Sequence, residues 1–132
     1  MDTGIYYADD QANHNFKLVG KLRFDQSPPL FEILEKLKDH VKLDNLVIDL
    51  KDASSLDSTM FGAICGLGVL FLKKGTQKPI LICKKNDIER MIKTLGLDQI
   101  FELKEKTIDV PGLIKLQTSV DKMGSAKGTG LM

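Results

Sequence analysis

The stretch Leu56–Gly75, LDSTMFGAICGLGVLFLKKG, combines a polar beginning with a long apolar run and a basic end. After Leu56 it presents an acid and two hydroxyls, and it then continues through thirteen uncharged residues, Met60–Leu72. A membrane-spanning helix needs about 20 apolar residues, so this run is too short to cross a bilayer. We therefore predict a buried helix inside a folded domain, with Gly75 at its end.

The residues in front of this helix suit a helix N-terminus. Asp57 can accept hydrogen bonds from the backbone N–H groups of Thr59 or Met60, and negative charge is favoured at that position. Ser58 then becomes the first helical residue, with its hydroxyl at the rim of the domain and not in the core. On spacing alone, plain capping explains these residues, because Ser, Thr and Asp are the usual helix-start residues. The alternative is that the first turn also carries a chemical role.

The rest of the chain alternates between strand-like and helix-like patterns. Strands are predicted at Gly4–Ala8, Asn15–Phe24, Leu46–Leu50, Lys78–Lys84 and Leu97–Leu103. Further helices are predicted from Pro28, after Asn86 or Asp87, and over Asp109–Val120. The order β-β-α-β-α-β-α-β-α predicts an α/β fold with a mixed sheet of about five strands and about four helices.

Two details of this prediction concern the first hairpin and the end of the chain. The alternation in Asn15–Phe24 places Phe16, Leu18, Leu22 and Phe24 on one buried face. Residues 1–120 are expected to form a single domain, and residues 121–132, which are rich in Gly, Ser and Lys, are expected to be a disordered tail.

The composition is that of an ordinary globular domain. The 132 residues are 42% apolar and 28% charged, which suits a core that needs no disulfides or metals. Lysine and arginine number 19 against 18 acids, so no strong attraction to nucleic acid or anionic lipid is expected. The N-terminus lacks the features of a signal peptide, and we expect a cytoplasmic protein. His14 and His40 are both expected on the surface, and no metal or cofactor site is predicted.

Three segments, in this order, resemble one known family. They are GKLRFDQSPPL at residues 20–30, LVIDLKDASSLDSTMFGAICGL at residues 46–67 and NDIERMIKTLGLDQIF at residues 86–101. Together they resemble the STAS domain in its anti-sigma factor antagonist branch, over roughly Gly4–Val120. In the second segment, the family has a strand that leads to an Asp-Ser-Ser/Thr-Gly-Leu-Gly sequence.

The resemblance implies a regulator that switches partners and is not an enzyme. Its phosphorylated serine corresponds to Ser58, with Thr59 as the alternative. The unmodified protein would bind an anti-sigma factor with a histidine-kinase-like ATPase fold and so free the sigma factor. Phosphorylation by that kinase would end the binding, and a PP2C-type phosphatase would reset the system. The free protein is expected to be a monomer, and the implied partner-binding residues are Asp25, Asp57, Ser58, Thr59, Met60 and Phe61.

The sequence departs from the family pattern at two places. Met60 and Phe61 stand where the family has Gly and Leu, and they are either core-facing replacements or contacts for a particular partner. Arg23 stands where related proteins often have an acid near the site, and Asp25 is the available substitute.

Two other functions compete with this interpretation. The first keeps the fold but makes it a scaffold or regulatory subunit of a stressosome or of a membrane transport complex; such relatives often lack the serine. The second is an enzyme that uses Ser58 as a nucleophile, which would need a base nearby. No histidine follows Ser58, and the nearest one before it is His40, so the enzyme is disfavoured.

Overall fold

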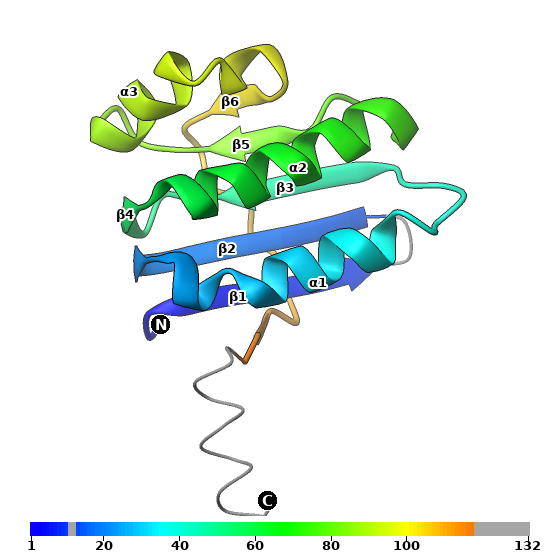
Figure 1. Ribbon diagram of the computed structural model, residues 1–132, viewed down its shortest axis with the longest axis horizontal. Helices are drawn as coiled ribbons and strands as arrows, with labels where there is room; N and C mark the ends of the chain where they lie inside the picture. Colours follow the sequence, from blue (N-terminus) through cyan, green and yellow to red (C-terminus); the bar gives the residue numbers. More distant parts are fainter. Residues whose placement is uncertain (11–12, 118–132) are drawn as a thin grey trace, which may run out of the picture.

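A single mixed sheet carries its helices on one face, as Figure 1 shows for the computed structural model of residues 1–10 and 13–117. The strands are β1 (Gly4–Asp10), β2 (Asn13–Leu22), β3 (Asn45–Asp49), β4 (Ala53–Leu56), β5 (Ile80–Ile82), β6 (Glu102–Lys104) and β7 (Ile114–Lys115). The helices are α1 (Pro28–Leu37), α2 (Ser58–Lys74) and α3 (Asp87–Thr94), with short 3-10 turns η1 (Phe24–Gln26) and η2 (Leu97–Gln99).

The sheet has the order β6-β5-β3-β2-β1-β7, with β4 pairing with β2 beyond the end of β3. The pairs in the middle are parallel, and β1 is antiparallel to both β2 and β7. The predicted α/β fold with a mixed sheet and an initial hairpin is therefore confirmed. The sequence missed β4, because Ala53–Leu56 has no apolar alternation: its two serines are exposed and only Ala53 is fully buried.

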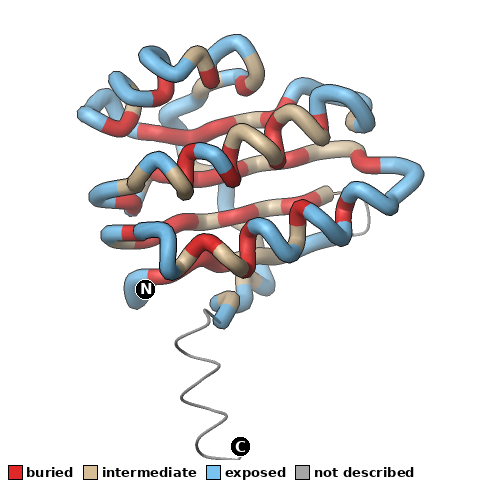
Figure 2. Tube along the Cα trace, in the orientation of Figure 1, coloured by how far each residue is buried: buried red, intermediate tan, exposed pale blue. Residues whose placement is uncertain are grey.

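Helix α2 is the central element of the core, as the buried residues along it in Figure 2 show. Its glycines permit close packing against neighbouring elements. A methyl group on Gly68 would lie 2.5 Å from the Phe101 ring, and one on Gly66 would lie 2.9 Å from Leu34. The predicted buried helix that begins at Ser58 and ends before Gly75 is confirmed. No helix in the described part of the chain is long and apolar enough to cross a membrane.

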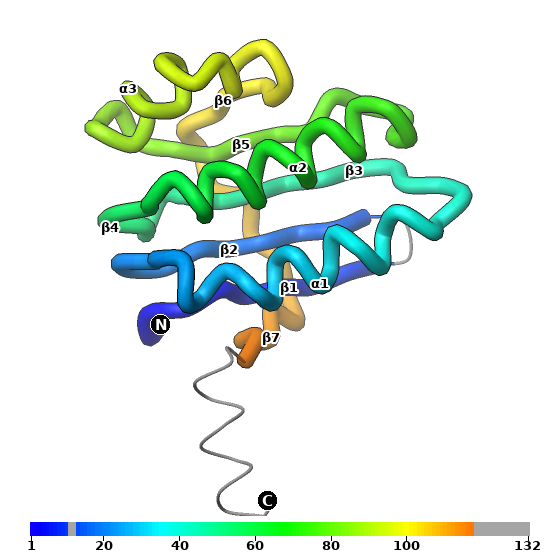
Figure 3. The backbone as a smooth tube through the Cα atoms, viewed as in Figure 1, coloured from blue at the N-terminus to red at the C-terminus, as the bar shows by residue number. Residues whose placement is uncertain are grey.

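The C-terminal part of the prediction is wrong. Residues 109–117 form no helix: they run behind the sheet and reach β7, which pairs with β1 (Figure 3). Pro111 and Gly112 interrupt the apolar pattern, and Gly112 has a positive φ of 78°, which only glycine adopts freely. Leu97–Leu103, predicted as one strand, is divided into η2 and β6. Residues 118–132, including the expected tail, lie outside the described residues.

The expected surface position of His14 is also wrong. The hairpin strands extend further than predicted, so His14 belongs to β2 and only 1% of its surface is exposed. Its Nδ1 lies 2.5 Å from the Tyr7 hydroxyl, and its ring meets that of Phe71 edge-on at 5.5 Å between centroids. Its Nε2 has no hydrogen-bond partner within the described chain. Burial lowers the pKa of His14, His40 acts in the same direction, and Asp9 opposes them.

This lowered pKa predicts that the protein loses stability in mild acid. The unfolded chain takes up a proton on His14 near pH 6.5, whereas the folded protein resists it. The contribution is therefore fully present above about pH 6.5 and is lost as the pH falls toward the folded pKa. Urea melts between pH 7.5 and 5.0 should show a steeper loss for the wild type than for His14→Phe. His40→Gln, which replaces an exposed histidine, should lose nearly as much stability in acid as the wild type does. An equal loss of stability with falling pH in the wild type and in His14→Phe would contradict the prediction.

Candidate functional site

The candidate site lies at the carboxyl end of β4, where the chain enters α2. In Figure 1 this end of the sheet also receives the turn η1, which connects β2 to α1. Open α/β folds place functional groups at this end, because several strand-to-helix connections converge there. Residues about 33 positions apart in sequence are thereby brought into contact.

Asp57 organises this end of the molecule through both carboxylate oxygens. Oδ1 accepts a hydrogen bond from Met60 N at 3.0 Å, which is the predicted helix cap. Oδ2 accepts another from Phe24 N in η1 at 2.8 Å. The backbone adds a third link, since Asp57 N donates to Leu22 O at 3.4 Å. The cap prediction is confirmed, and the contact with Phe24 is an addition that the sequence did not indicate.

The two hydroxyl residues that follow differ in exposure. Ser58 is the first residue of α2 and is exposed, while Thr59 is half-buried. Neither hydroxyl is engaged in a hydrogen bond with the described part of the protein. The N-terminus of a 17-residue helix lies directly beneath them, so a negative charge at this position is favoured by the free N–H groups of the first turn.

Met60 and Phe61 have core positions. Met60 has no exposed surface and Phe61 retains 4%, so the core-facing alternative describes how their side chains lie. Gly62, by contrast, is exposed, and no heavy atom lies within 4 Å of the place its Cβ would take. The surface beside Ser58 is therefore open at Gly62, although the helix beneath it is apolar.

The turn η1 supplies the rest of the exposed surface. Arg23 and Asp25, which the family resemblance places near the site, are both exposed. Phe24, predicted to continue the buried face of β2, is instead 68% exposed. The strand ends at Leu22, and the next residues turn into η1. The missed signal is the Asp-Gln-Ser-Pro-Pro sequence that follows Phe24, which favours a turn close to the strand end.

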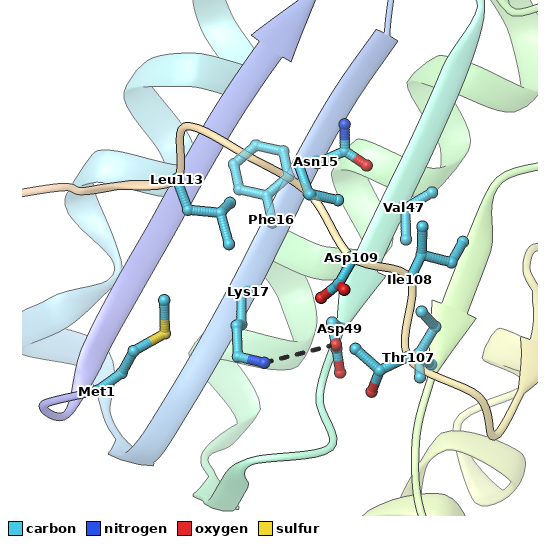
Figure 4. A pocket seen from close by; sticks show the side chains of 12 residues that line it. Met1, Asn15, Phe16, Lys17, Val47, Asp49, Thr107, Ile108, Asp109 and Leu113 are labelled. Carbon is cyan, nitrogen blue, oxygen red and sulfur yellow. Dashed lines mark ion pairs between the residues drawn. The ribbon is translucent and has the colours of Figure 1, made fainter.

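A second feature lies behind the sheet, where residues 107–113 cross it. They line a cavity of about 180 Å³ whose polar lining residues include Asn15, Lys17, Asp49, Thr107 and Asp109. The Lys17 ammonium lies 3.8 Å from Asp49 (Figure 4) and 3.1 Å from Asp52. Asp49 is buried, and Lys51 N also donates to it at 2.9 Å, so its charge is compensated. No group of three or more His, Cys, Asp or Glu among residues 1–10 and 13–117 is arranged to hold a metal ion.

The protein is a small α/β domain with a mixed sheet and helices on one face. Its candidate site is the exposed hydroxyl at the start of α2. The family model of the STAS domain matches residues 8–110. The chain belongs to the STAS domain family.

Three solved structures share this fold. An anti-sigma factor antagonist from Mycobacterium paratuberculosis has a TM-score of 0.59 at 22% identity, covering 80% of this chain and 86% of that one. The anti-sigma factor antagonist SpoIIAA in its unphosphorylated form has a TM-score of 0.57 at 10% identity, with coverage of 93% and 96%. An uncharacterized protein from Shewanella loihica with a SpoIIAA-like fold has a TM-score of 0.52 at 18% identity, with coverage of 83% and 93%. No curated protein matches the chain at a significant level.

Proposed function

We propose that this protein is an anti-sigma factor antagonist that works by phosphorylation-controlled partner switching. The unmodified form binds an anti-sigma factor that is also a serine kinase with a histidine-kinase-like ATPase fold, and the sigma factor is released. Phosphorylation of Ser58 ends this binding, and a PP2C-type phosphatase restores the unmodified form. The protein is a cytoplasmic, non-enzymatic regulator and a monomer when free.

The observation that carries this proposal is the position of Ser58. Its side chain is exposed, yet it begins a helix whose next turns are buried in the core. A kinase can transfer the γ-phosphoryl group of ATP to Ser58 Oγ, with loss of the hydroxyl proton and release of ADP, without unfolding the domain. The phosphate adds a charge of about −1.5 to −2, which the helix N-terminus tolerates but a docked partner beside Asp57 does not.

The polar residues around Ser58 form the polar part of the proposed partner-binding surface. Asp25, Asp57 and Thr59 contribute polar groups at its edge. Gly62 lies one helical turn after Ser58 on the same face and leaves room for side chains of a partner. Met60 and Phe61, which the family resemblance also placed in this surface, support it from the core side.

A phosphorylation experiment tests the assignment of the site. After incubation with its cognate kinase and ATP, the protein is expected to carry one phosphate, on Ser58, because that hydroxyl is exposed and Thr59 is half-buried. Peptide mapping by mass spectrometry identifies the residue, and Ser58→Ala should abolish the signal while Thr59→Val preserves it. Phosphate on Thr59 alone would contradict the assignment, and phosphate on neither residue would favour the scaffold function.

A further inference from the structure

The carboxylate of Asp57 joins two segments that the sequence keeps far apart. One oxygen binds the first turn of α2 at Met60 N, at 3.0 Å, and the other binds η1 at Phe24 N, at 2.8 Å. A cap requires only one of these hydrogen bonds. The second therefore connects the residue before Ser58 directly to the neighbouring loop.

The loop at the other end of this connection is exposed and depends on few external contacts. Its remaining hydrogen bonds in the described chain stay close to itself: Gln26 N to Arg23 O at 2.9 Å, Arg23 N to Gln26 Oε1 at 3.1 Å, Ser27 N to Phe24 O at 3.1 Å, and Ser27 Oγ to Phe24 O at 2.6 Å. They give η1 its shape but do not fix it to α2. The Asp57 carboxylate is the hydrogen-bond acceptor that does so.

The loop presents the kind of side chain that anchors protein interfaces. Phe24 is 68% exposed, although phenylalanine is usually buried, and Asp25 beside it is exposed too. Exposed aromatic groups that a partner can enclose contribute strongly to binding, provided that they are held in place beforehand. Because Phe24 N donates to the Asp57 carboxylate, the position of Phe24 relative to Ser58 depends on Asp57.

We propose that Asp57 is a positioning residue that couples Ser58 to η1: it holds Phe24 and Asp25 in the orientation that the partner binds, and a phosphate on Ser58 opens this link. The inference rests on the proposed function and gives it a second component. A phosphate on the adjacent residue repels the Asp57 carboxylate and competes for the same N–H groups of the first helical turn. Withdrawal of the carboxylate leaves Phe24 N without its acceptor, so η1 loses its hydrogen bond to the start of α2, while the backbone link from Asp57 N to Leu22 O still holds the end of β2.

Amide hydrogen exchange measured by NMR tests the link without any partner. The samples are the wild type, the protein with phosphoserine genetically encoded at position 58, and Asp57→Asn. Asparagine still caps a helix but has only one acceptor oxygen, so Met60 N should stay protected while Phe24 N does not. We expect Phe24 N to exchange about tenfold faster, or more, in both altered proteins, as loss of a hydrogen bond to a charged group implies.

A distant amide provides the control. Gly75 N donates to Phe71 O at 2.7 Å at the other end of α2, and its exchange should be the same in all three samples. Equal protection of Phe24 N with and without the phosphate would overturn the proposal, as would an unprotected Phe24 N in the wild type.

A binding measurement separates this inference from the proposed function. Unphosphorylated Asp57→Asn should bind the kinase about tenfold more weakly than the wild type, because η1 is no longer held. If the wild type does not bind any such kinase, the proposed function fails while the exchange data still decide the link. If the wild type binds and Asp57→Asn binds equally well, the link does not position the loop for the partner, and the proposal is overturned.

Discussion

Replacing Leu67 by alanine is expected to lower the free energy of unfolding by roughly 2–5 kcal/mol. Leu67 has no exposed surface and lies in the middle of α2, on the face that packs against the sheet. Removal of its side chain forfeits the transfer of three carbons from water and leaves a cavity.

Leu72→Ala is the matched control for this prediction. The substitution is the same and occurs in the same helix, but Leu72 is 49% exposed. Its cost should stay within about 0.5 kcal/mol, as is usual for surface positions. Urea or thermal melts of the two variants measure the difference. Similar losses for both would mean that α2 is not packed through the face that contains Leu67.

The central helix and its cap were predictable because they depend on local chemistry. Thirteen uncharged residues after an Asp-Ser-Thr sequence indicate a buried helix, and Asp57 is a strong N-cap wherever such a helix begins. The alternation of strand and helix patterns was equally sufficient for the fold class. Each of these patterns is contained within a single helix or strand, so contacts with other elements do not change the structure that it predicts.

Several of the missed features depend on contacts between elements, whereas the helix predicted at Asp109–Val120 fails for the local reason that Pro111 and Gly112 interrupt its pattern. Phe24 has the spacing of a buried strand residue, but the chain leaves the sheet after Leu22. The Phe24 N–H then donates to the Asp57 carboxylate, which belongs to another element. His14 has the polar neighbours of a turn, yet β1 and β3 pair around it. Ala53–Leu56 becomes a strand only because β2 extends beyond β3 and offers free hydrogen-bonding groups.

Ser58→Asp is expected to abolish partner binding and to leave stability almost unchanged. The new carboxylate lies in the first turn of α2, where negative charge is favoured by roughly 0.3–1 kcal/mol. Its side chain replaces an exposed hydroxyl, so no core contact is lost. Melting curves of the variant and the wild type should therefore nearly coincide.

Binding responds differently because a partner must remove water from the new charge beside Asp57. An uncompensated charge at an interface commonly costs roughly 2–5 kcal/mol, and 2 kcal/mol already corresponds to about a thirtyfold loss of affinity. Calorimetric titration with the kinase measures this loss. Ser58→Ala should bind like the wild type and escape phosphorylation, which excludes loss of the hydroxyl itself as the cause.

Gln77→Glu provides the control for the effect of charge in general. It adds one negative charge at an exposed residue beyond the other end of α2, and it should leave the affinity unchanged at physiological salt, where the Debye length is about 8 Å. A loss confined to Ser58→Asp therefore identifies the start of α2 as the surface that the partner covers. If Ser58→Asp binds as tightly as the wild type, no partner covers Ser58, and Asp57, Ser58 and Thr59 serve only to begin the helix.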